Sequence, residues 1–121
     1  MSKNIIFLLI WIAAYGCYWE NEETLYPDSG MCDTTFVSYS EDIVPILTNN
    51  CYVCHSNQNA PDKTFGLALE NYEDVVSYSA VIPHVINQEK GYLAMPRNTA
   101  KLDACLINKI EAWINDGSPD N

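Results

Sequence analysis

The clearest pattern in the chain is a helical repeat of apolar residues close to its C-terminal end. Asp103 can cap a helix that begins at Ala104 and ends near Asp116. Gly117 suits the position after the C-terminus of such a helix, and Pro119 follows it. The apolar positions at helical spacing are Leu106, Ile107, Ile110, Trp113 and Ile114. The pattern predicts an amphipathic helix whose apolar face belongs to the core.

A second helix is predicted shortly before two closely spaced cysteines. Ser38 and Ser40 are candidate N-caps, and the acidic residues that follow favour the positive end of the helix dipole. Pro45 has no N–H group and must lie in the first turn, which places the helix start close to Glu41. The apolar stripe of this helix is formed by Ile43, Ile46 and Leu47.

The segments between these two helices carry weaker signals. Asn71 can cap a short helix that ends near Tyr78. Residues 56–63 are polar and are predicted to form a loop. Pro83 interrupts the chain again, and we expect residues 84–101 to be mostly irregular.

The N-terminal segment has the pattern of a targeting signal. Lys3 precedes an unbroken apolar run of ten residues, Ile5 to Ala14. A helix of that length reaches only about 15 Å, half the thickness of the hydrocarbon layer, so it is too short to span a membrane. We therefore predict that residues 1–16 are a signal peptide and that the protein is exported.

Cys17 follows Ala14-Tyr15-Gly16 at the end of this run. Small residues before a cysteine resemble the lipobox of bacterial lipoproteins, in which the cysteine becomes the lipidated first residue. Ala14 replaces the usual leucine and Tyr15 is bulky where a small residue is usual. Cleavage by the ordinary signal peptidase, with Cys17 unmodified, is therefore the alternative. The acidic residues 17–31 show no sustained periodicity and are predicted to be a lipid-anchored tether.

The balance of charges excludes one class of partner. The chain has 16 acidic and 6 basic residues, for a formal charge of −10. A nucleic-acid-binding protein would need a basic face, so we expect no nucleic acid partner. The charge suits a carrier that meets basic or neutral partner proteins, and it equally suits a merely soluble acidic surface.

The segment Cys51-Tyr52-Val53-Cys54-His55 carries the strongest chemical signal. A C-x-x-C-H run is the attachment signature of a c-type haem, because its two thiols add across the haem vinyl groups and its histidine ligates the iron. A structural zinc site is an alternative, but zinc needs four ligands and the chain has no second close pair. A thioredoxin-like redox pair is another, but it should follow a strand in a βαβ unit, and no such pattern precedes Cys51.

With this motif the chain resembles the small single-haem cytochromes c of class I. The resemblance covers residues 32–121 and is specific at 51–55, 95–96 and 102–117. It implies an all-α domain with the cytochrome c fold, whose N- and C-terminal helices pack across each other around one covalently bound haem c. Cys51 and Cys54 would form the thioethers, and His55 would be the fifth iron ligand. The apolar run 66–69 would lie against the haem edge.

The resemblance also implies that Met95 is the sixth iron ligand. Met95 lies forty residues after His55 in an irregular stretch, and Pro96 follows it, as in the Met-Pro distal motif of class I cytochromes. His84, the only other histidine, is the rival and would give a bis-histidine haem of lower potential. For Met95 the plainer alternative is core filling.

The remaining cysteines can be assigned once the protein is taken to be exported, because oxidising surroundings permit disulfides. With Cys17 assigned to a lipid and the motif cysteines to haem, Cys32 and Cys105 remain. We expect these two residues to form a disulfide, and two buried free thiols are the alternative.

These expectations predict electron transfer by a single covalent haem with His55 and Met95 as axial ligands. We do not expect an enzyme, because an iron with both axial positions filled has no open site. The carrier would be membrane-anchored through Cys17, in the periplasm or at the cell surface, and would meet redox partner proteins. The alternatives are a haem enzyme or gas sensor with a displaceable sixth ligand, and a haem subunit of a larger oxidoreductase or multihaem assembly.

Overall fold

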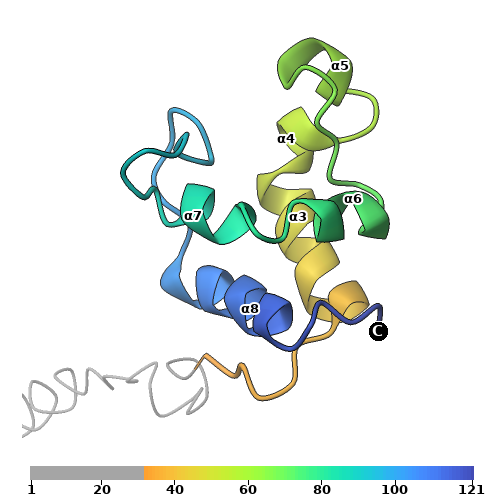
Figure 1. Cartoon of the computed structure of the whole chain (residues 1–121), viewed down its shortest axis with the longest axis vertical. Helices are drawn as coiled ribbons and strands as arrows, with labels where there is room; N and C mark the ends of the chain where they lie inside the picture. The colour runs from red at the N-terminus through yellow and green to blue at the C-terminus, as the bar shows by residue number, and fades with distance from the viewer. Residues whose placement is uncertain (1–31) are drawn as a thin grey trace, which may run out of the picture. The chain divides into compact units, whose positions relative to one another are not determined.

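A computed structural model describes residues 32–121, which form one compact unit (Figure 1). This unit coincides with the range predicted for the folded domain. The predicted signal peptide, Cys17 and the tether lie outside the described residues. No helix within 32–121 is long and apolar enough to cross a membrane.

The described part of the chain is all-helical, which confirms the predicted all-α class, and residues 32–121 contain no strand. The elements are η1 (Tyr39–Ile43), α3 (Val44–Asn50), α4 (Tyr52–His55), α5 (Ala60–Lys63), α6 (Tyr72–Ser77), α7 (Ile82–Ile86) and α8 (Ala104–Asn115). Figure 1 shows α8 running across the lower end of the continuous η1–α3 helix. The first and last helices of the described unit therefore pack against each other.

The core lies where these helices meet. Tyr39 of η1 stacks on Trp113 of α8, with 5.3 Å between the ring centroids. Tyr72 of α6 packs on Tyr39 in a T-shaped arrangement, with 5.1 Å between the ring centroids. The apolar stripes predicted for both helices contribute to this core, with Val75 of α6 buried as deeply as Ile43. The buried cluster comprises Val37, Tyr39, Ile43, Ile46, Leu47, Leu69, Val75, Ile82, Ile86, Ile107, Ile110 and Trp113.

The last helix begins and ends as its sequence predicts. The Asp103 carboxylate accepts a hydrogen bond from the Cys105 N–H at 2.8 Å, which caps the N-terminus of α8. At the other end Gly117 has a φ of +91°, and the Ser118 N–H donates to the Trp113 carbonyl at 2.9 Å. This is the Schellman arrangement, which a glycine at that position permits without steric cost.

The first helix begins earlier than predicted. Ser38 is the N-cap and accepts from the Glu41 N–H at 3.3 Å, so the helix begins at Tyr39 and not at Glu41. The earlier start arises because η1 is a π-helical turn, in which the Val44 N–H donates to the carbonyl of Tyr39, five residues earlier. Pro45 thus lies in the first turn of α3, with the π-helical turn ahead of it.

Two of the segments expected to be irregular contain short helices. Pro61 and Pro83 lie at the first or second position of α5 and α7, where a missing N–H costs nothing. Both prolines start a helix where the sequence analysis placed a loop or a break. The helix predicted after Asn71 is present as α6, but the Asn71 side chain donates to Asp74 at 3.0 Å and accepts no capping bond.

Candidate functional site

The C-x-x-C-H segment lies at the turn where α3 ends and α4 begins. The Cys51 N–H continues the bonding of α3 by donating to the Leu47 carbonyl at 2.7 Å. The Cys54 and His55 N–H groups both donate to the Cys51 carbonyl, at 3.0 and 2.8 Å. Residues three and four apart in a helical turn share one face. The backbone therefore places both thiols and the imidazole on the same side of α4.

The two motif cysteines are free thiols and are half-buried. Burial raises the pKa of the Cys51 thiol to about 11, because the thiolate would lose its hydration. A dithiol oxidoreductase needs a cysteine whose pKa is lowered, so this environment opposes the thioredoxin-like alternative.

His55 is oriented by a backbone carbonyl. Its Nδ1 lies 2.9 Å from the Leu67 carbonyl oxygen, which can only accept, so Nδ1 carries the proton. Residues 32–121 provide no hydrogen-bond partner for Nε2, which would present its lone pair to a metal. Fixing one ring nitrogen in this way is how proteins prepare the other nitrogen for a metal.

The segment that carries the Leu67 carbonyl is itself tied to the motif. The Leu67 oxygen also accepts from the Thr64 hydroxyl at 2.7 Å, and the Leu69 N–H donates to the His55 carbonyl at 2.8 Å. The apolar run that we expected at a haem edge therefore lies beside His55. The sequence analysis missed Thr64 and the role of the Leu67 carbonyl, since a backbone acceptor twelve residues away leaves no residue-type signal.

Two polar side chains bond to the backbone of α4 near its C-terminal end: Asn59, just before α5, and Lys63, within α5. Lys63 Nζ donates to the Val53 carbonyl at 2.7 Å, and Asn59 Nδ2 donates to the same carbonyl at 3.3 Å. A helix of four residues leaves its last carbonyls without partners in the helix, and a cation favours that end. Lys63 and Asn59 thus stabilise a turn too short to persist alone. Both residues lie in the segment 56–63, which the sequence predicted to be a polar loop.

Met95 lies on the loop between α7 and α8, away from α4 in the sequence. It is half-buried, its peptide bond to Pro96 is cis, and its N–H donates to the Val85 carbonyl at 2.9 Å. In Figure 1 the loop after α7 and the α4–α5 segment stand on opposite sides of the view. The structure therefore groups Cys51, Cys54 and His55 on one face, while Met95 belongs to a separate segment.

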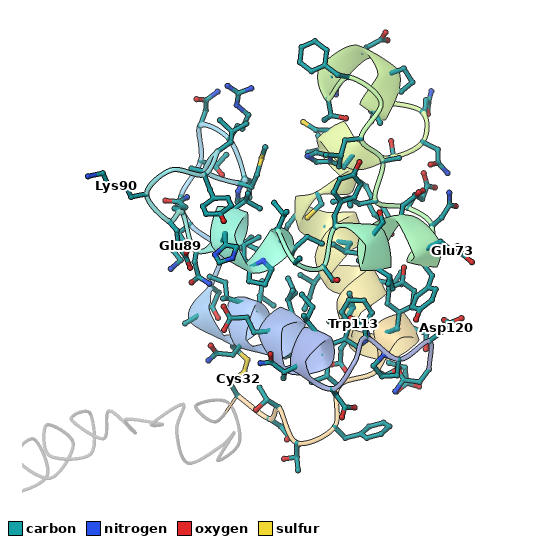
Figure 2. The ribbon with its side chains drawn as sticks, in the orientation of Figure 1. Cys32, Glu73, Glu89, Lys90, Trp113 and Asp120 are labelled. Atoms are coloured by element: carbon teal, nitrogen blue, oxygen red, sulfur yellow. A yellow bond between two sulfur atoms is a disulfide. The ribbon has the colours of Figure 1, made fainter. Side chains whose placement is uncertain are left out.

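The rival ligand His84 belongs to α7 and is engaged locally. Its Nδ1 lies 2.7 Å from a Glu89 carboxylate oxygen, and its ring stacks on Tyr92 with 4.5 Å between centroids. Figure 2 shows Glu89 on the loop that follows α7. These contacts tie the His84 ring to its own loop.

No group of three or more His, Cys, Asp or Glu side chains within 32–121 could hold a metal ion, so the zinc alternative gains no support. Two surface hollows of this unit lie elsewhere, one beside Trp113 and Asp116 and the other beside Leu102 and Ile107.

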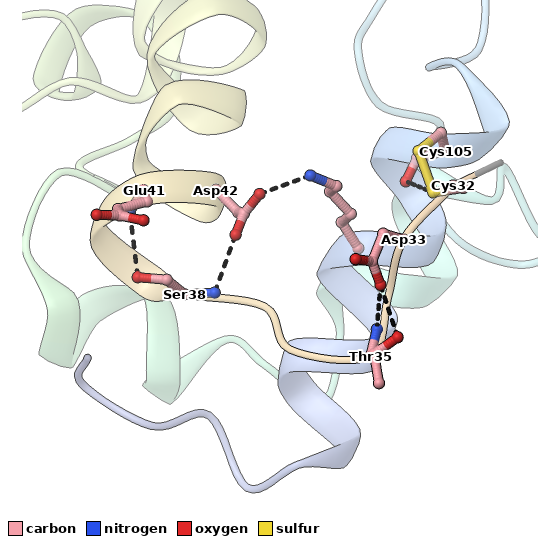
Figure 3. A network of polar contacts seen from close by, with 8 residues as sticks. Cys32, Asp33, Thr35, Ser38, Glu41, Asp42 and Cys105 are labelled. Carbon is pink, nitrogen blue, oxygen red and sulfur yellow. Dashed lines mark hydrogen bonds and ion pairs between the residues drawn. A yellow bond between two sulfur atoms is a disulfide. The ribbon is translucent and has the colours of Figure 1, made fainter. Parts of the chain in front are cut away.

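Cys32 and Cys105 lie at disulfide distance, with 2.06 Å between the sulfur atoms and 5.3 Å between the Cα atoms (Figure 3). The pair matches the expected disulfide and joins the first described residue to the first turn of α8. Close by, Lys109 of α8 forms an ion pair of 2.6 Å with Asp42 of η1.

Comparisons with protein-family models, with curated proteins and with solved structures find no match. The grounds for a function are therefore the residues of this chain and the contacts between them.

Proposed function

We propose that the chain is a small c-type cytochrome that carries electrons through one covalently bound haem. The observation that carries the proposal is the shared face of α4, where two free thiols accompany an imidazole whose Nε2 is unbonded within the described unit. The residue types fit this cofactor, because Cys51 and Cys54 can form two thioethers and His55 can supply an axial nitrogen.

The surroundings of the motif support the same proposal. Lys63 and Asn59 hold the α4 backbone, and the Leu67 carbonyl holds the imidazole, so the three reactive side chains are positioned without any cofactor contact. The packing of η1 against α8 is compatible with the cytochrome c fold, in which the terminal helices also pack together. We therefore include that fold in the proposal.

Bound haem would supply an iron that cycles between two oxidation states. We propose His55 as its fifth ligand and Met95 as its sixth. The half-buried thioether of Met95 has no polar contact within residues 32–121, whereas His84 is bonded to Glu89 and stacked on Tyr92. Filling both axial positions leaves electron transfer as the function, in place of catalysis at the iron.

The test of the ligand set is the ferric spectrum of the purified protein. Thioether ligation gives a weak charge-transfer band in the far red, which imidazole ligation lacks. We expect this band in the wild type and its loss in Met95→Ala. The matched variant His84→Phe keeps an aromatic ring against Tyr92 and should retain the band. A wild type without the band, or a band that survives in Met95→Ala, contradicts Met95 ligation.

Carbon monoxide separates the carrier from the enzyme or sensor alternative. A six-coordinate carrier should bind carbon monoxide slowly in its ferrous state, because Met95 must first leave the iron. Rapid binding by the wild type, at the rate of the Met95→Ala variant, would identify an open site and would favour the alternative.

We further propose that the carrier is exported and membrane-anchored through Cys17, on the sequence pattern of residues 1–31 alone. Its partners would be redox proteins with a basic or neutral docking face, which the formal charge of −10 supports. Intact mass of the mature protein tests the anchor, since a lipidated chain begins at Cys17 and gains the mass of its acyl groups. An unmodified N-terminus contradicts it.

A further inference from the structure

The loop of residues 87–101 is fastened at both of its ends. Asn87 Nδ2 donates to a Glu111 carboxylate oxygen of α8 at 2.5 Å and to the Pro83 carbonyl at 3.0 Å. At the other end Lys101 Nζ donates to the Asn87 side-chain oxygen at 3.0 Å. These contacts fix where the loop leaves and returns, but they lie outside the stretch that contains Met95.

The middle of the loop is fastened to α7 by its own contacts. The Met95 N–H donates to the Val85 carbonyl at 2.9 Å, and the Glu89 N–H donates to the His84 carbonyl at 3.0 Å. The side chains add the Glu89–His84 contact of 2.7 Å and the stack of Tyr92 on His84. The two rings are nearly parallel, at 14°.

Tyr92 is not held in place by burial in the hydrophobic core. Its side chain is 46% exposed, so hydrophobic burial is not what places it. It lies three positions before Met95, and its ring packs on His84 of the same short helix that accepts the Met95 N–H. Because a single hydrogen bond opens easily, the aromatic stack is an additional contact that keeps this stretch against α7.

We propose that Tyr92, stacked on His84, is a positioning residue that holds the Met95 loop against α7 and so keeps the Met95 thioether available to the iron. This inference rests on the proposed function, because it assigns a role to Tyr92 in the ligation by Met95. Glu89 orients the His84 ring on which Tyr92 packs.

The experiment compares Tyr92→Ala with Tyr92→Phe in the full-length haem protein. The first variant removes the stack, and the second keeps the ring while removing only the hydroxyl. An aromatic pair of this type changes an opening equilibrium about two- to tenfold. We expect the Met95 amide to exchange its hydrogen faster by that factor in Tyr92→Ala and at the wild-type rate in Tyr92→Phe.

Imidazole added to the ferric protein measures the ligation itself. It must displace Met95, so a loosened loop should lower the apparent dissociation constant for imidazole by the same factor of about two to ten in Tyr92→Ala. Tyr92→Phe should behave as the wild type. The control is Tyr78→Ala, which removes another partly exposed tyrosine, at the end of α6, and should change neither quantity.

Four results would overturn the inference: wild-type amide exchange in Tyr92→Ala, unchanged imidazole affinity in that variant, equal loosening in Tyr92→Phe, or an equal change in Tyr78→Ala. A wild type without covalent haem contradicts the proposed function and, with it, the effect of Tyr92 on ligation by Met95. In that case amide exchange, which needs no haem, still decides whether Tyr92 holds the loop.

Discussion

Two regions of the described unit bury their apolar side chains to very different degrees. The base, residues 37–50 and 102–121, contains η1, α3 and α8, and Ile43 and Trp113 within it are each 1% exposed. The attachment half, residues 51–101, contains α4 to α7 and the Met95 loop. There Val53 is 65% exposed and Phe65 is fully exposed.

All but one of the exposed large apolar side chains lie in the attachment half. None of those in the base is exposed, and the exception, Phe36, lies in the segment just before it. The attachment half also contributes to the core, through Leu69, Val75, Ile82 and Ile86. Its exposed large apolar side chains are Val53, Phe65, Tyr78, Val81, Tyr92 and Leu93.

The contacts that hold the two regions differ in kind as well. The base is closed by the Tyr39–Trp113 stack, the Lys109–Asp42 ion pair and the hydrogen bond from the Ser40 N–H to the Asn121 backbone oxygen at 2.9 Å. In the attachment half, side chains that bond to backbone carbonyls add to the backbone hydrogen bonds, as Lys63 and Asn59 do at Val53. The difference teaches that the base leaves no large apolar side chain exposed, whereas several of those in the attachment half are exposed.

The largest effect is expected from removing the attachment thiols. Cys51→Ala with Cys54→Ala prevents covalent haem, and a core of about 90 residues is marginal without it. We expect a loss of about 5 kcal/mol or more, comparable with the whole stability of such a domain, so that the protein is largely unfolded or degraded. Circular dichroism and denaturant titration of the purified variant measure this loss.

A double variant that folds cooperatively without haem would contradict this prediction, because the attachment half would then be stable without the cofactor.

The disulfide should come next in size, and it acts through the base. It closes a loop with a sequence separation of 73 residues, which on the chain-entropy estimate stabilises the fold by about 4 kcal/mol. The Cys32→Ser, Cys105→Ser variant should lose about that much while keeping its haem. Alkylation before and after reduction, read by intact mass, decides whether the bond exists, and two reactive thiols in the unreduced protein would rule it out.

The ion pair between η1 and α8 should make the base sensitive to acid. The hydrogen bond from Lys109, followed by that from the Ser38 N–H, lowers the pKa of Asp42 against the opposing effect of burial. A lowered pKa in the folded state stabilises the fold above about pH 4 and ceases to do so as the pH falls through the folded value. Asp42→Asn should cost about 1 kcal/mol at neutral pH and should flatten the acid limb of the stability curve. An acid limb as steep as that of the wild type contradicts this role.

The smallest effect is expected at the buried hydroxyl of Tyr39. Burial raises its pKa to about 12, and the oxygen has no hydrogen-bond partner within the described residues. The folded pKa lies above the unfolded value of about 10, so this group lowers stability as the pH rises from about 10 to about 12. Tyr39→Phe should change stability at neutral pH by less than about 1 kcal/mol and should reduce the alkaline loss. A large loss at neutral pH would show that the hydroxyl is bonded.

The sequence predicted the base better than the attachment half. Helix α8 and the Ser38 cap depend on residues within a few positions of one another, and such local signals are visible in a sequence. The α4 turn depends instead on Lys63 and Asn59, and the orientation of His55 depends on the Leu67 carbonyl. Backbone acceptors reached from six to twelve residues away have no residue-type signature. The motif residues could therefore be predicted from their spacing, whereas the residues that hold them in place could not.

The most direct test of the central claim is the pyridine haemochrome spectrum of the exported, full-length protein after denaturation and extraction with acidified solvent. The account predicts that the haem stays with the chain and gives the spectrum of a haem whose two vinyl groups are saturated by thioethers. It also predicts an intact mass increased by one haem, with Cys51 and Cys54 protected from alkylation. Haem that extracts into the solvent, or a chain without haem whose two motif thiols both react, would contradict it.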